Sequence, residues 1–102
     1  MFIAMNRFRI APGFEAPFEE MWRSRDSRLS EVEGFVAFKL LKGPVAEDHA
    51  LYVSHSTWET RAAFEGWMKS PHFRRAHADA GESKAMYLGP PAFEGYESVV
   101  EA

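Results

Sequence analysis

The sequence predicts an α+β domain with the split β-α-β order of a ferredoxin-like fold. Residues 2–10 have the two-residue period of a strand, whereas the apolar residues of 14–29 are spaced by threes, fours and a seven, as on one face of a helix. Along the chain the expected elements follow the order strand, helix, strand, strand, helix pair and strand. That order is typical of ferredoxin-like domains, and we interpret residues 1–102 as one such domain.

The first strand and the first helix each have an apolar face. The strand over residues 2–10 is ended by Pro12-Gly13. Its mostly apolar face carries Phe2, Ala4, Phe8 and Ile10, with Asn6 among them. The helix over residues 14–29 carries three arginines in its second half, where cations suit the helix dipole. Its apolar face consists of Phe14, Phe18, Met21, Trp22 and Leu29.

A β-hairpin is expected next. Gly34 precedes an apolar strand over residues 35–41, and another strand begins at Leu51 and runs to about Thr57. Between these strands, Lys42-Gly43-Pro44 and Glu47-Asp48 have the composition of a turn. The two strands are therefore expected to pair with each other.

Two helices and a last strand complete the chain. Thr60 is a suitable N-cap for a helix whose apolar residues are Ala63, Phe64, Trp67 and Met68. Ser70-Pro71 ends this helix and begins another, because Ser caps well and Pro is tolerated at the first helical position. The third helix places on one face Phe73, Ala76, His77 and Ala80. Residues 81–91 are expected to form a loop, and residues 93–100 the last strand.

The composition excludes several kinds of function. With 15 Asp and Glu against 12 Lys and Arg, the chain lacks the basic face of a general nucleic-acid binder. Because it has no cysteine, it can form no disulfide, thiolate metal site or thiol nucleophile. No apolar run approaches the roughly 18 residues that span a bilayer, and the start lacks the features of a signal peptide. We therefore expect a cytoplasmic protein with no membrane or nucleic-acid partner.

The sheet is expected to need a partner on its second face. Helices cover only one face of such a sheet, so the other is either solvated or covered. We expect much of this second face to be apolar, with Ile3, Met5, Val36, Phe38 and Leu40 on it. The sequence therefore predicts a homodimer in which two sheets pack together as a dimeric α+β barrel.

Asn6 is the first candidate site residue, because it interrupts an otherwise apolar strand face. An amide buried there needs hydrogen-bond partners, since leaving it unsatisfied costs roughly 1–3 kcal/mol. Either a neighbouring strand or loop supplies them, or the amide is a donor aimed into a pocket between sheet and helices.

His77 is the second candidate, because it lies on the apolar face of the third predicted helix beside Ala76 and Ala80. A single histidine there is either a satisfied core residue or a ligand, and the small alanines leave room for a flat molecule beside the imidazole. The other three histidines form no multi-histidine metal spacing with it.

Trp22 and Trp67 project from two different predicted helices toward the sheet. Tryptophan at helical spacing is usually a core residue, but two indoles with one amide and one histidine also suit a planar, mostly apolar ligand. No nucleophile elbow, phosphate-binding loop or pair of carboxylates indicates another kind of site, and strand serines such as Ser54 have ordinary structural explanations.

Four segments carry a resemblance to a known family. They are Met5-Asn6-Arg7-Phe8, the stretch from Glu33 to Phe38, the Trp-x-Thr-x-x-Ala-Phe-x-x-Trp pattern from Trp58 to Trp67, and the stretch from Ser70 to His77. The chain resembles the antibiotic-biosynthesis-monooxygenase superfamily of dimeric ferredoxin-like domains. Within it, the chain is similar to the IsdG-like bacterial heme-degrading monooxygenases, particularly their rhizobial branch, and the resemblance spans nearly the whole chain.

The resemblance implies a role for each candidate. His77 would be the proximal ligand of heme iron, Asn6 a donor near the distal ligand, and Trp67 the residue that presses on the porphyrin and ruffles it. Trp22 and Phe73 would line the heme pocket. Arg25, with Arg74 or Arg75, is a candidate from helical position to meet the propionates.

The implied activity is oxidative cleavage of heme, which is both substrate and cofactor. O2 and an external electron donor, a reductase or a small reductant, would be consumed, and iron and a linear tetrapyrrole released. Two alternatives stay open. A cofactor-free monooxygenase of polycyclic phenols or quinols would use an Asn and a Trp in the same cavity without needing His77, and a heme-binding carrier or sensor would not turn its ligand over.

Overall fold

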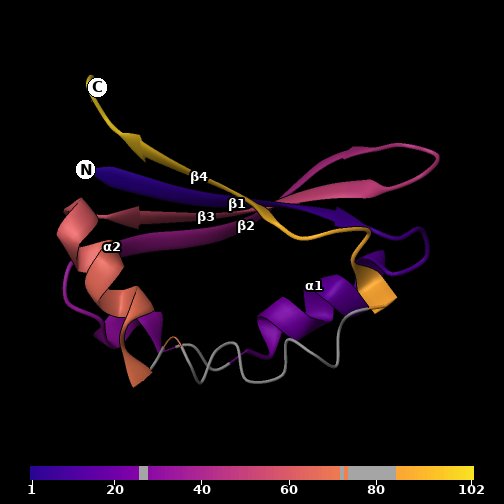
Figure 1. Cartoon of the computed structure of the whole chain (residues 1–102), viewed down its shortest axis with the longest axis horizontal. Helices are drawn as coiled ribbons and strands as arrows, with labels where there is room; N and C mark the ends of the chain where they lie inside the picture. The colour runs from indigo at the N-terminus through magenta and orange to yellow at the C-terminus, as the bar shows by residue number, and fades with distance from the viewer. Residues whose placement is uncertain (26–27, 72, 74–84) are drawn as a thin grey trace.

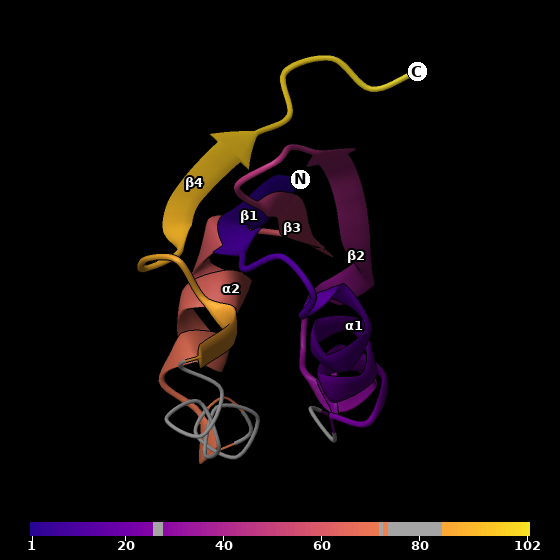
Figure 2. The same ribbon diagram turned by 90° about the vertical axis from the view of Figure 1, so that its right-hand side faces the viewer.

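Four strands form one antiparallel sheet in the order β2-β3-β1-β4 in a computed structural model that describes residues 1–25, 28–71, 73 and 85–102. The strands are β1 (Phe2–Ile10), β2 (Phe35–Val45), β3 (Ala50–Trp58) and β4 (Ala92–Glu97). The helices α1 (Glu15–Arg23) and α2 (Arg61–Met68) lie on the same face of the sheet (Figure 1 and Figure 2), and the short 3-10 helix η1 (Leu29–Glu31) follows α1. This arrangement confirms the predicted ferredoxin-like α+β fold.

The core lies between the sheet and the two helices. Alternate residues of β1 and β3 face the helices, so the predicted apolar face of β1 is the buried one. One buried cluster lies under α1 and contains Phe8, Ile10, Phe18, Ala50 and Tyr52. The other lies under α2 and contains Phe2, Ala4, Trp58 and Phe64.

The first helix is shorter than the predicted range 14–29, because α1 ends at Arg23. The hydroxyl of Ser24 donates to the carbonyls of Glu20 and Met21, at 2.9 and 3.3 Å, and such local bonds compete with continuation of a helix. Leu29 therefore belongs to η1. The residue just before η1, Arg28, has a left-handed conformation with φ of 50°.

The second strand is longer than predicted, and its faces are different. β2 continues to Val45, so Gly43 and Pro44 belong to a strand, and the turn lies at residues 46–49 instead. Pro44 is tolerated because β2 is an edge strand with an irregular register between Lys42 and Val45.

A second irregularity, between Phe35 and Ala37, corrects the predicted second face of the sheet. An extra residue at a bulge reverses the alternation of the residues that follow it. Phe38 and Leu40 accordingly lie on the helix side, where Phe38 stacks on Trp22 and Leu40 packs against the core. The uncovered face instead carries partly exposed residues of all four strands, among them Ile3, Met5, Leu41, Val53 and Tyr96.

The second helix begins as predicted. The Thr60 hydroxyl accepts a hydrogen bond from the Ala63 N–H at 3.1 Å and caps α2. The Ser70 hydroxyl accepts one from the Phe73 N–H at 3.3 Å, as expected where another helix begins at Pro71. Ala76, His77 and Ala80 lie outside the described residues.

The C-terminal segment also departs from the predicted loop and strand. Tyr87 bridges Ile10, and the carbonyl of Met86 accepts from the Ala11 N–H at 2.8 Å, so part of the predicted loop pairs with the end of β1. β4 ends at Glu97, and Ser98 is held instead by hydrogen bonds to Met1. Within the described residues, no helix combines the length and the apolar character needed to cross a membrane.

Candidate functional site

A cavity of about 860 Å3 lies between the sheet, α1 and α2. Its floor consists of alternate residues of two neighbouring strands, Ala4, Asn6 and Phe8 from β1 and Ser54 and Ser56 from β3. Ligand pockets usually enclose roughly 300–1,000 Å3, so this cavity has room for a large organic ligand.

Flat aromatic rings form two opposite walls of this cavity. On the α1 side, Trp22 and Phe38 stack with their ring centroids 5.4 Å apart and their planes 17° apart. On the α2 side, Trp67 meets the edge of Phe73 at 4.9 Å, and Phe64 is near it. Such walls suit a planar, mostly apolar ligand.

Two of the three polar side chains on this floor lie side by side. Asn6 and Ser54 are Cα partners in the antiparallel pairing of β1 with β3, and both line the cavity. Ser54 is only 7% exposed to solvent. Among residues 1–25, 28–71, 73 and 85–102, neither side chain has a hydrogen-bond partner, and both are placed where a ligand in the cavity could bond to them.

Among the described residues that line this cavity there is one cation. The guanidinium of Arg25 stacks over Trp22, with its carbon 4.0 Å from the ring centroid, and Arg25 lines the cavity with Tyr87. Burial lowers the pKa of Arg25 and raises the pKa of Tyr87. An arginine nevertheless stays protonated at neutral pH, so the cavity offers a positive charge to a ligand carboxylate.

The indole nitrogen of Trp22 is a further polar atom at this wall. It is buried, and the described part of the chain supplies no acceptor for it. A buried donor without a partner costs roughly 1–3 kcal/mol, which a bound acceptor would recover.

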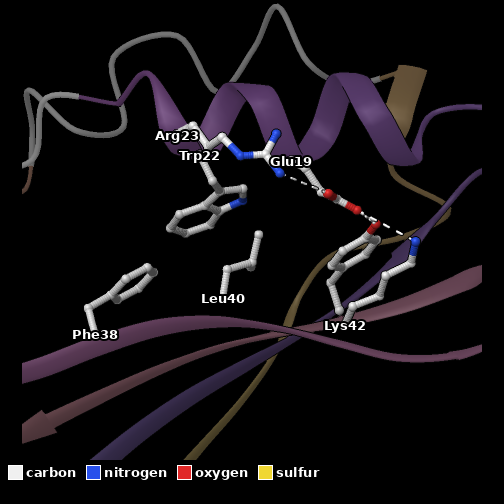
Figure 3. A pocket seen from close by; sticks show the side chains of 7 residues that line it. Glu19, Trp22, Arg23, Phe38, Leu40 and Lys42 are labelled. Atoms are coloured by element: carbon white, nitrogen blue, oxygen red, sulfur yellow. Dashed lines mark hydrogen bonds and ion pairs between the residues drawn. The ribbon is translucent and has the colours of Figure 1, made fainter.

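A smaller cavity of about 330 Å3 shares the Trp22–Phe38 pair with the large one (Figure 3). There the hydroxyl of Tyr52 donates to Glu19 at 2.5 Å, and Lys42 and Arg23 lie 3.6 and 3.2 Å from the same carboxylate. The Tyr52 hydrogen bond lowers the pKa of Glu19, whereas burial and Glu19 raise the pKa of Tyr52. These groups satisfy one another and fasten α1 to the sheet.

The large cavity brings together four of the predicted site residues, namely Asn6, Trp22, Trp67 and Phe73. The fifth, His77, lies outside the described residues. Among the described residues, no three His, Asp or Glu side chains gather where they could hold a metal ion. The roles assigned to these residues remain predictions.

Several residues that line the cavity are not predicted from the sequence. The sequence pattern puts Phe38 on the wrong face, does not single out Tyr87 or Phe93, and gives Ser54 only a structural explanation. A signal for Ser54 existed, because hairpin pairing could place a second polar residue opposite Asn6 on the same face.

Relatives with curated names share part or most of the chain. A protein of Listeria welshimeri named heme-degrading monooxygenase is 35% identical over 57 residues, which are 55% of this chain and 47% of that protein. The match therefore spans about half the length of that relative. A Staphylococcus epidermidis protein named heme oxygenase (staphylobilin-producing) is 29% identical over 86 residues, 82% of this chain and 80% of that protein.

Solved structures share the fold over nearly the whole chain. A variant of MhuD, described as having two manganese protoporphyrin IX molecules bound per active site, has a TM-score of 0.80 at 20% identity and covers 100% of this chain and 98% of its own. SnoaB of Streptomyces nogalater, described as a cofactor-independent oxygenase, has a TM-score of 0.70 at 22% identity and covers 98% and 94%. Residues 1–79 match the antibiotic biosynthesis monooxygenase family, and the chain belongs to that family.

Proposed function

We propose that the chain binds heme in the large cavity and cleaves it oxidatively, with release of iron and a linear tetrapyrrole. The observation that carries the proposal is the cavity of about 860 Å3 with aromatic walls on two sides and a polar floor at Asn6. The names of the Listeria and Staphylococcus relatives support heme as the ligand. O2 and an external electron donor are the co-reactants that this chemistry requires.

The described residues fit such a ligand. A porphyrin is planar and apolar over most of its surface, as the two aromatic walls require. Its carboxylates would be attracted to the guanidinium of Arg25 at the cavity. We infer from the family resemblance that His77 holds the iron, since a neutral imidazole is a common proximal ligand.

Each residue of the cavity would then have a separate task. Bound heme supplies both the redox-active iron and the ring to be oxidised. The amide of Asn6 would donate a hydrogen bond to a small molecule held beside the heme, and Trp67 would press on the ring from the α2 side. The apolar walls exclude water, which strengthens the hydrogen bond from Asn6.

We also propose that the functional unit is a homodimer. The uncovered face of the sheet carries Ile3, Met5 and Leu41, and the segment after β4 leaves on that side with Val99 91% and Val100 85% exposed (Figure 2). A second copy would bury these residues. Sedimentation should show a dimer at micromolar concentration, and a stable monomer would contradict it.

The cytoplasmic location and the single-domain organisation remain predictions.

Titration of the purified protein with hemin tests the proposed function. We expect a saturable change of the Soret band at one hemin per chain, followed by loss of that band under reductant and air with a tetrapyrrole product seen by mass spectrometry. Failure to saturate would refute heme as the ligand. Saturation with a spectrum that survives reductant and air would identify a carrier or sensor instead.

A histidine variant tests the assignment of the iron ligand. His77→Ala should abolish ring cleavage and change the Soret spectrum, because the proximal ligand is lost. His49→Ala is the matched control, since His49 lies in the β2–β3 turn and bonds to Asp48 at 2.9 Å. Ring cleavage retained by His77→Ala would refute the assignment.

A cofactor-free monooxygenase of polycyclic phenols or quinols is the second candidate. The polar floor at Asn6 and Ser54 favours it, because a phenolic oxygen could bind there while the rings lie between the aromatic walls. Oxidation of such a phenol by protein stripped of metal, with no hemin response, would identify this activity.

A further inference from the structure

One row of residues crosses the sheet beneath the cavity. In the order β2, β3, β1 and β4 it consists of Leu40, Ser54, Asn6 and Phe93, each the Cα partner of the next. The two polar residues are therefore adjacent at the centre, with an apolar residue on either side. Side chains directly opposite each other in such a pair have Cβ atoms about 4.5–5.5 Å apart, so one small group can contact both.

The hydroxyl of Ser54 differs from that of its neighbour Ser56. Ser56 donates to the carbonyl of Ala4 at 3.3 Å and accepts from the indole nitrogen of Trp58 at 2.9 Å, so its bonds serve the core. Ser54 is just as buried, yet within the described ranges its hydroxyl has no protein partner. A polar group kept in that condition on a cavity floor points to a ligand.

We propose that Ser54 and Asn6 form a two-point hydrogen-bonding subsite for one small group, a single oxygen atom of a ligand or a water-sized molecule. The amide of Asn6 donates, and the Ser54 hydroxyl both donates and accepts. Such a pair recognises a hydroxyl group from both sides and also stabilises a small acceptor. Ser54 thereby becomes a second specificity-determining residue of the cavity.

The first arm of the test rests on the proposed function and uses the ferric hemin complex with azide. Azide is the probe because its far end accepts the hydrogen bonds that an oxygen would accept. Ser54→Ala should weaken azide binding about three- to tenfold, the effect of one hydrogen bond. Ser54→Thr, which keeps the hydroxyl, should stay within about twofold of the parent protein. Thr57→Val removes a hydroxyl from the opposite face of β3 and should leave azide binding unchanged.

A double variant separates a shared group from two independent ones. If Asn6 and Ser54 bind the same atom, Asn6→Ala combined with Ser54→Ala should weaken azide binding less than the product of the two single effects. A simple product would contradict the shared subsite, even if each residue mattered alone.

The second arm does not depend on heme. Tryptophan fluorescence of the protein without hemin is titrated with 1-naphthol and with naphthalene, which lacks the hydroxyl. The parent protein should prefer the naphthol, and Ser54→Ala should lose about three- to tenfold of that preference, while Thr57→Val should keep it. Preference for naphthol without a hemin response would refute the proposed function but retain the subsite. A parent protein that does not prefer naphthol, or a Ser54→Ala variant indistinguishable from it in both arms, would overturn the subsite.

Discussion

Trp22 and Phe38 stack with their planes 17° apart and their ring centroids 5.4 Å apart, and the large and the smaller cavity both border this pair. One ring comes from α1 and the other from β2, so the pair joins a helix to the edge of the sheet. The guanidinium carbon of Arg25 lies 4.0 Å from the centroid of the Trp22 ring. The position of this wall therefore depends on the packing of α1 against β2.

Removal of the indole should open the wall between the two cavities. Trp22→Ala is expected to lower the free energy of unfolding by about 2–3 kcal/mol, less than for a fully buried Trp because this side chain is partly exposed. It should also weaken hemin binding at least tenfold. Trp22→Phe keeps an aromatic ring and should lose only about 1 kcal/mol. Urea unfolding measures the loss of stability, and hemin titration measures the loss of affinity. Equal losses in Trp22→Ala and Trp22→Phe would contradict a stacking role for the ring.

Gly34 lies where β2 approaches α2, and a larger residue should not fit. Its φ is +82°, and a Cβ atom there would overlap the Cβ of Ala63. Gly34→Ala should lower the free energy of unfolding by about 2–4 kcal/mol, from the left-handed backbone and the overlap together. Gly13→Ala is the control, because its φ is +88° but nothing lies within 4 Å, and it should lose only about 1 kcal/mol.

A compensating substitution sharpens the test of Gly34. Ala63→Gly in the Gly34→Ala background removes the overlapping atom and should recover part of the loss in urea unfolding. Ala63→Gly alone should cost about 1 kcal/mol, because glycine destabilises a helix interior. A double variant that loses the full sum of the two single effects would mean that the backbone conformation alone accounts for the effect.

The Tyr52–Glu19 hydrogen bond should make stability depend on pH at both ends of the scale. It lowers the pKa of Glu19 below its ordinary value of 4.5, so this contribution is present above that pH and is lost as the pH falls through the lowered value. The pKa of Tyr52 is raised above 10.0, so its contribution is present below pH 10 and is lost as the pH rises further, where the unfolded chain ionises first.

Urea unfolding across pH tests this coupling. Tyr52→Phe should be less stable than the parent near neutral pH, and the difference should narrow below pH 4.5 and above pH 10. Glu19→Gln keeps an acceptor without the charge. It should flatten the acid limb and also weaken the alkaline limb, because the charge of Glu19 helps to raise the pKa of Tyr52. A difference between parent and Tyr52→Phe that does not change with pH would contradict the coupling.

Local signals were sufficient to predict most of the fold. The alternation of β1 and the Thr60 cap of α2 depend on neighbouring residues in the sequence, and both are confirmed. The errors arise where tertiary structure decides. The bulge after Phe35 depends on pairing with β3, and the bridge of Tyr87 to Ile10 joins segments far apart in sequence.

The candidate site was predictable in part for the same reason. Asn6 and Trp67 are conspicuous within their own elements, and the cavity brings them together. Phe38 was misplaced because one bulge reverses the faces of a strand. Ser54 became notable only when the register placed it opposite Asn6, since a serine in a strand carries no signal by itself.

Arg25 should discriminate between ligands with and without carboxylates. Its guanidinium is the cation that stacks on Trp22 at the cavity, so we expect Arg25→Gln to weaken hemin binding about five- to tenfold through loss of a charged hydrogen bond. Hemin dimethyl ester has no free carboxylate, and its affinity should change less than twofold. Arg23→Gln is the matched control, because Arg23 lies on the same helix but pairs with Glu19 and Glu20 outside the large cavity. Optical titration of hemin and of hemin dimethyl ester against the parent protein, Arg25→Gln and Arg23→Gln gives the comparison. Equal weakening for the acid and the ester would show that Arg25 acts by supporting Trp22 rather than by binding a carboxylate.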